Sequence, residues 1–266
     1  MKEKRDKNTN IKNYISLAFG LFIVLGMISF MILGGNAWFY DINLSSTRVE
    51  LHRVFSSAFY IIYYTSQSNL FLGLMFIVNY FKKTPLTNSL FFASVALITI
   101  TFIIYWTAVA PFNSVEIWNN IYLNFDSIIT HVINPMLGFF YLIWVRKEFV
   151  INKKIIGICA MYLGVFLISS DILYGASAYY DPNSKHANHI NGAAVYTFID
   201  VQNFFFMNLQ NLPWVAWLMN IILIIACPFI VIALSFVWIK LTKIQTQQNS
   251  YYSWMDKLKD KYIVKK

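Results

Sequence analysis

Long apolar runs separated by short polar segments dominate the chain. A helix needs about 20 apolar residues to cross the roughly 30 Å hydrocarbon core of a bilayer. Six runs reach that length, at residues 14–33, 57–81, 90–110, 127–145, 155–174 and 214–239. Their apolar positions are continuous rather than alternating, which favours helices over the strands of a barrel. The pattern therefore predicts an all-α membrane protein built as a bundle of six transmembrane helices.

The basic residues predict how these helices are oriented. Of the 21 Lys and Arg residues, all but three fall on one side of the predicted bundle, in the N-terminus, two connections and the tail. The other side holds Arg48, Arg53 and Lys185. Cytoplasmic segments carry such an excess of Lys and Arg. We therefore expect both termini to be cytoplasmic, with a basic N-terminus at 1–13, the six-helix domain at 14–240 and a basic tail at 241–266.

Composition excludes several classes of protein. Hydrophobic residues make up 58% of the 266 residues and charged residues 12%, which excludes an ordinary soluble enzyme and a disordered chain. The net charge of +9 lies in short clusters between apolar runs, so we expect no nucleic-acid partner. The expected partners are the lipid bilayer and a lipid substrate, and the sequence does not identify a protein partner. The richness in Asn, Lys, Ile and Phe is typical of an AT-rich bacterial genome, which predicts a plasma-membrane location.

The predicted second helix carries a polar face near its outer end. Thr65, Ser68 and Asn69 share this face, because they are spaced at i, i+3 and i+4. Polar side chains inside spans are costly, so they are the first candidates for function. At a rise of 1.5 Å per residue, Thr65 lies about 12 Å below the outer end of its helix. We therefore expect this polar face to lie in the outer leaflet.

Two other predicted helices bring polar residues to a similar depth. The fourth contains His131 and Asn134, followed by Pro135, which frees a backbone carbonyl at or near His131. The fifth runs outward through Asp171. An imidazole takes up a proton near neutral pH and can activate a neighbouring hydroxyl group. Thr65 as the nucleophile and His131 as its general base are therefore a candidate hydrolytic pair.

Neighbouring polar residues have candidate supporting roles. Ser68, Asn69 or Asn134 would donate hydrogen bonds to a developing oxyanion, and Asp171 would orient or polarise the site. The same residue types also join membrane helices by hydrogen bonds, so a non-catalytic scaffold is the alternative. A small-molecule transporter ranks third, because the sequence has no internal repeat and the inner halves of the helices are mostly apolar. Asn79 is the main exception to that apolar character.

No common cofactor or metal motif accompanies these residues. P-loop, G-x-G-x-x-G, H-E-x-x-H, C-x-x-C and G-x-S-x-G patterns are absent, so no cofactor is expected. His186 and His189 with Asp181 lack a firm third ligand, and we expect no metal site. The Phe-rich stretch 197–209 is either a lid over an outer pocket or a plain interfacial helix. The tail is either an amphipathic helix on the inner membrane surface or a solvated basic segment.

The polar segments at 64–72 and 130–137 resemble those of a known family. Six helices, a T-x-x-S-N motif on the second and a His followed by Pro on the fourth are similar to the androgen-induced-gene family and to related bacterial membrane proteins. Members of that family are six-helix membrane hydrolases of fatty acid esters of hydroxy fatty acids. The resemblance implies a lipid ester as substrate and a catalytic pair at Thr65 and His131. The acidic residue that often follows the fourth helix's Pro in bacterial relatives is not evident at 140–144.

Overall fold

The computed structural model describes residues 2–34, 55–111, 121–180, 195 and 213–247, and nearly all of them are helical. The helices are α1 (Lys2–Gly34), the 3-10 helix η2 (Ser56–Ile62), α3 (Tyr64–Phe81), α4 (Pro85–Ile104), the π-helix η3 (Tyr105–Val109), α6 (Ile121–Ile128), the π-helix η4 (Ile129–Ile133), α7 (Asn134–Val145), α8 (Lys153–Tyr180) and α9 (Pro213–Thr242). Two short strands, β1 (Val150–Ile151) and β2 (Gln245–Thr246), pair in parallel. The predicted all-α class is confirmed.

Five helices within the described residues are long and apolar enough to cross a membrane, so the chain is a multi-pass membrane protein. They are Asn10–Leu33, Pro85–Thr107, Leu123–Val145, Lys153–Ala176 and Trp214–Thr242. The run predicted at 57–81 is not among them. It is divided, because η2 ends at Ile62, Tyr63 has an extended backbone and α3 begins at Tyr64 with its polar turns. Six crossings therefore remain a prediction.

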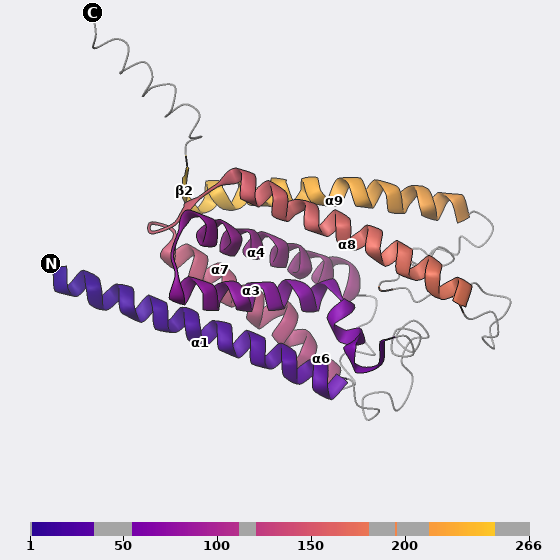
Figure 1. Ribbon diagram of the computed structural model, residues 1–266, viewed down its shortest axis with the longest axis horizontal. Coiled ribbons are helices and arrows are strands. Elements are labelled where there is room, and N and C mark those ends of the chain that lie inside the picture. The colour runs from indigo at the N-terminus through magenta and orange to yellow at the C-terminus, as the bar shows by residue number, and fades with distance from the viewer. Residues whose placement is uncertain (1, 35–54, 112–120, 181–194, 196–212, 248–266) are drawn as a thin grey trace, which may run out of the picture.

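Helix α4 occupies the centre of the bundle. It packs against α3, α7, α8 and α9, and α1 lies along α3 (Figure 1). One part of the core lies between α1, α3, α4 and α7, where the rings of Phe76, Phe91 and Tyr141 have centroids 4.9–5.5 Å apart. The other part lies between α3, α4, α8 and α9. Large apolar side chains of α1 and α9 such as Leu25 and Phe229 are exposed, as expected for helices that face lipid.

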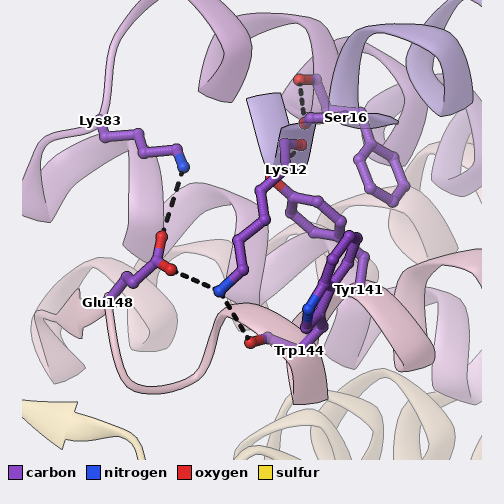
Figure 2. A network of polar contacts seen from close by, with 7 residues as sticks. Lys12, Ser16, Lys83, Tyr141, Trp144 and Glu148 are labelled. Carbon is purple, nitrogen blue, oxygen red and sulfur yellow. Dashed lines mark hydrogen bonds and ion pairs between the residues drawn. The ribbon is translucent and has the colours of Figure 1, made fainter. Parts of the chain in front are cut away.

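Charged contacts gather at the end of the bundle where α1 begins. Glu148, which follows α7, lies between two lysines (Figure 2). Lys12 Nζ of α1 is 2.5 Å from Glu148 Oε1, and Lys83 Nζ of the α3–α4 connection is 3.6 Å from Oε2. Burial lowers the pKa of Lys83, and the Glu148 carboxylate opposes this effect. The pairing of β1 with β2 brings the end of α9 to the same place, so the segments predicted to be cytoplasmic meet at one end.

Several sequence-based predictions fall outside the described residues. These are the outer loop residues 35–54, the Phe-rich stretch 197–209, the metal-ligand candidates Asp181, His186 and His189, and the tail from residue 248. They remain predictions. The candidate site residues on α3 and on the continuous helix α6–η4–α7 lie within the described part.

Candidate functional site

The membrane-length helix Leu123–Val145 contains a π-helical segment, η4, at His131. The Asn134 N–H donates to the Ile129 carbonyl, five residues earlier. Pro135, in the first turn of α7, lacks the N–H that would bond the His131 carbonyl. The indole Nε1 of Trp106 donates to that carbonyl instead, at 3.4 Å. The prediction that Pro135 frees a backbone carbonyl at His131 is therefore confirmed.

Helix α4 ends in a second π-helical segment, η3, beside the first. The Ala110 N–H, directly after η3, donates to the Tyr105 carbonyl at 2.8 Å. The Tyr105 ring stacks on the His131 imidazole, with centroids 3.7 Å apart and an interplanar angle of 8°. Single π-helical turns are rare in proteins and occur frequently at functional sites. Their meeting at His131 marks this part of the bundle as the candidate site.

One ring nitrogen of His131 has no hydrogen-bond partner in the part of the chain that the structure describes. Its Nδ1 is buried and makes no hydrogen bond among the described residues. The ring also interacts with the backbone of Thr101. A backbone carbonyl beside an imidazole fixes the ring proton on the nitrogen that faces it. We therefore assign the lone pair to Nδ1, which can accept a proton from a hydroxyl group that approaches it.

Asn69 joins α3 to the helix that carries His131. Its Nδ2 donates to the Thr65 carbonyl at 2.8 Å and to the Thr130 carbonyl at 3.2 Å. Its Oδ1 accepts from Asn134 Nδ2 at 2.7 Å. Both asparagine side chains are fully buried. One amide therefore holds the backbone of Thr65 next to the residue that precedes His131.

Ser68 and Thr65 continue this polar face of α3. Ser68 Oγ lies 2.8 Å from Thr101 Oγ1 and donates to the Thr65 carbonyl at 3.1 Å. The Thr65 side chain is half-buried. Within the described part of the chain, no hydrogen bond joins Thr65 to the Nδ1 of His131. The structure thus gathers Ser68, Asn69 and the backbone of Thr65, but it does not pair the two residues predicted to be catalytic.

The carboxylate in this cluster is Asp126. The Tyr60 hydroxyl, from η2, donates to Asp126 Oδ1. The Thr130 hydroxyl donates to the Asp126 carbonyl at 2.8 Å. Asp171 lies on α8 and makes no hydrogen bond to the cluster among the described residues. Its role in orienting or polarising the site stays a prediction.

Sequence reasoning missed Asp126, Tyr60 and Tyr105. Asp126 lies one residue before the span predicted at 127–145, whereas the helix begins at Ile121. Asp126, Thr130 and Asn134 are polar residues spaced four apart along the sequence. This spacing could have identified Asp126 as a candidate from the sequence. Nothing comparable marks Tyr60 or Tyr105, because their positions depend on a 3-10 helix and a π-helix that hydropathy does not predict.

Neither metal ligands among the described residues nor similar proteins help to identify the site's function. Among the described residues, no three His, Cys, Asp or Glu side chains gather as metal ligands. No protein-family model, curated protein or solved structure matches the chain. The resemblance to the androgen-induced-gene family therefore stays an expectation. A functional interpretation has to rest on the geometry around His131.

Proposed function

We propose that this protein is an intramembrane hydrolase of lipid esters, with His131 as the general base and Thr65 as the nucleophile. One observation carries the proposal. The Nδ1 of His131 is a buried acceptor with no partner among the described residues, at the meeting point of two π-helical segments. An imidazole that serves packing alone is expected to have both nitrogens satisfied. A buried basic nitrogen without a partner among the described residues fits acid–base chemistry better.

The chemistry follows the usual course of acyl transfer. The Thr65 hydroxyl attacks the ester carbonyl while its proton passes to His131 Nδ1. The tetrahedral intermediate collapses to an acyl-threonine ester, and the leaving alkoxide takes the proton from His131. Water, deprotonated by the same nitrogen, then releases the fatty acid and restores Thr65. Asn134 Nδ2 has a second N–H beyond the one given to Asn69, and is our candidate donor to the oxyanion.

Substrate binding must complete this arrangement. The Thr65 hydroxyl has to come within hydrogen-bond reach of Nδ1, and catalytic hydrogen bonds are often long before the substrate is bound. The Asn69 amide supports this step, since it already bonds the backbone carbonyls of Thr65 and of Thr130, the residue before His131. The cluster is buried among apolar helices, so the substrate would enter sideways from the bilayer.

The proposal includes the finer topology. α3 lies between α1 and α4, and it would make the sixth crossing (Figure 1). The end with Lys12, Lys83 and Glu148 would face the cytoplasm of a bacterium, with both termini. The candidate site would then lie in the outer leaflet of the plasma membrane. Access of a membrane-impermeant reagent to single cysteines at the two ends tests this orientation.

Turnover of lipid esters by protein in nanodiscs tests the function. His131→Phe keeps a ring to stack on Tyr105 but removes the base, and Thr65→Ala removes the nucleophile. We expect each to lower turnover by about 100-fold or more, the usual contribution of a general base. Thr107→Ala is the matched control. It also removes a threonine hydroxyl, but that hydroxyl donates to the Ile103 carbonyl of its own helix and has no role in the proposed chemistry. Equal turnover in all four proteins would contradict the proposal.

A non-catalytic scaffold is the second candidate, and two contacts favour it. Asn69 with Asn134 and Ser68 with Thr101 are hydrogen-bonded pairs between helices, as expected for contacts that hold a bundle together. This function predicts that the variants at Thr65 and His131 change stability and that no ester is turned over.

A further inference from the structure

A closed ring of contacts connects His131 and Asn134 through two neighbouring helices. The His131 ring interacts with the backbone of Thr101 on α4, and Thr101 Oγ1 lies 2.8 Å from Ser68 Oγ on α3. The next residue of α3, Asn69, accepts a hydrogen bond from Asn134 Nδ2 at 2.7 Å. Asn134 follows His131 by three residues on the continuous helix η4–α7, which closes the ring. Both side chains are therefore held beside the same contact between α3 and α4.

The hydrogen-bond network fixes which amide atom of Asn134 is left over. Asn69 faces two backbone carbonyls, those of Thr65 and Thr130, so the atom there must be its Nδ2. The other amide atom of Asn69 is then an oxygen, and Asn134 must meet it with Nδ2. The atom of Asn134 that has no partner among the described residues is therefore the acceptor Oδ1, on a side chain that is fully buried.

The hydrogen-bond donors around this contact already have acceptors. Ser68 donates its only proton to the Thr65 carbonyl at 3.1 Å, so Thr101 supplies the proton between the two hydroxyl groups. Asn69 gives both of its amide protons to backbone carbonyls, and Thr130 gives its hydroxyl proton to the carbonyl four residues earlier. None of these four side chains has a proton left for another acceptor.

Two buried acceptors remain, His131 Nδ1 and Asn134 Oδ1, and neither has a partner among the described residues. Buried polar atoms rarely stay unpaired in native proteins, and ordered water often supplies the missing partner. A water molecule carries two O–H donors on one atom, so it can satisfy both acceptors at once and still present a lone pair. An alcohol carries one O–H donor and would leave one of the two acceptors unpaired, at a cost in free energy. This pair of acceptors therefore distinguishes water from alcohols.

We propose that Asn134 Oδ1 and His131 Nδ1 together position the water that releases the fatty acid, and that they select water over alcohols as the acyl acceptor. This inference rests on the proposed function and deepens it. In the release step, the water oxygen attacks the carbonyl carbon of acyl-Thr65. One water proton passes to His131 Nδ1, and the other stays on the oxygen and is donated to Asn134 Oδ1. The bond to the Thr65 oxygen then breaks, and that oxygen takes the proton from His131, so the products are a fatty acid and free Thr65.

Competition between water and methanol tests this selection. The full-length protein in nanodiscs is given para-nitrophenyl palmitate in buffer that contains methanol, and empty nanodiscs provide the background. Free palmitic acid and its methyl ester are then quantified by mass spectrometry. Their ratio is set after acyl-Thr65 has formed, so it does not depend on the acylation rate or on the amount of folded protein. A donor to the oxyanion serves attack by water and by methanol equally, so its loss does not change the ratio either.

Asn134→Leu removes the acceptor, and we expect it to raise the ratio of methyl ester to free acid about 10-fold. Thr99→Val is the matched control, because it removes a hydrogen bond between α4 and α9, from Trp238 Nε1 to Thr99 Oγ1 at 3.0 Å, and leaves both acceptors in place. Its ratio should equal that of the wild type. An unchanged ratio in Asn134→Leu with ester still turned over, or an equal rise in Thr99→Val, would overturn the inference alone. Absence of both products in the wild type would refute the proposed function and the inference with it.

An experimental structure of the wild type that resolves ordered water gives a second readout, which needs neither turnover nor a variant. We expect one water molecule within hydrogen-bond distance of both Asn134 Oδ1 and His131 Nδ1. A protein donor at these acceptors, or no water between them, would overturn the inference even if Asn134→Leu does not fold.

Discussion

The packing of α1 on α3 through Gly20 leads to a prediction about stability. A Cβ added at Gly20 would lie 2.7 Å from Ile77 Cγ1, 2.8 Å from the Gly73 carbonyl oxygen and 3.0 Å from the Ile77 backbone N. Two of these three atoms belong to the backbone of α3, which cannot move aside by a change of rotamer. Gly20→Ala therefore has to push the two helices apart.

The magnitude follows from two opposing effects. Overpacking of this kind costs about 1–3 kcal/mol. Replacing Gly by Ala within a helix returns up to about 1 kcal/mol through helix propensity. We expect Gly20→Ala to lower the free energy of unfolding by about 1–2 kcal/mol. Gly26, also on α1, has nothing within 4 Å of an added Cβ, so Gly26→Ala should be neutral or stabilising.

Unfolding in mixed micelles with increasing dodecyl sulfate, followed by circular dichroism, measures the difference. Gly73→Ala should fall between the two, because its new Cβ would meet side-chain atoms of Ile23 and Val24 at 2.9 Å. These β-branched side chains are stiff in helices but can still shift with α1. If Gly20→Ala proves as stable as Gly26→Ala, α1 does not pack on α3 as described, and the case for α3 as a crossing helix is lost.

Three further predictions concern polar contacts. A double-mutant cycle of Asn69→Ala and Asn134→Ala should give a coupling of about 1 kcal/mol in unfolding free energy, in the range of hydrogen bonds in membranes; additive effects would refute the contact. Tyr60→Phe should lower stability by about 1 kcal/mol or more, through loss of the hydrogen bond to the Asp126 carboxylate, and a neutral result would contradict that contact. Burial lowers the pKa of Lys83 in the folded protein below its ordinary 10.5, so the unfolded chain binds more protons between the two values. Stability should therefore rise with pH through that window, and Lys83→Met should flatten the rise in dodecyl sulfate titrations at several pH values.

Hydropathy is sufficient to predict the class and most of the helices. Five predicted apolar runs correspond to helices long enough to cross a membrane, because continuous apolar surface has few uses outside lipid. The division at Tyr63 is not predictable in this way, since it separates η2 from the polar first turns of α3. Hydropathy averages over such a break. It therefore overestimates the continuity of the second helix.

Part of the site was predictable from the chemistry of single residues rather than from hydropathy. Asn69 and Asn134 are expected candidates, since buried amides inside spans need partners, and they bond each other. Pro135 also predicts a freed carbonyl near His131, which Trp106 satisfies. The stack of Tyr105 on His131 is not predictable, because each ring's direction depends on a π-helical turn. Side-chain directions after such a turn differ from those of a regular α-helix.

Covalent labelling with a lipid-like fluorophosphonate tests the central claim most directly. The purified wild-type protein is compared with Thr65→Ala and His131→Phe variants of matched melting temperature, and the modified residue is identified by peptide mass spectrometry. The proposed chemistry predicts labelling of the wild type at Thr65 and its loss in both variants. Absence of labelling in the wild type, or equal labelling of all three proteins, would contradict it.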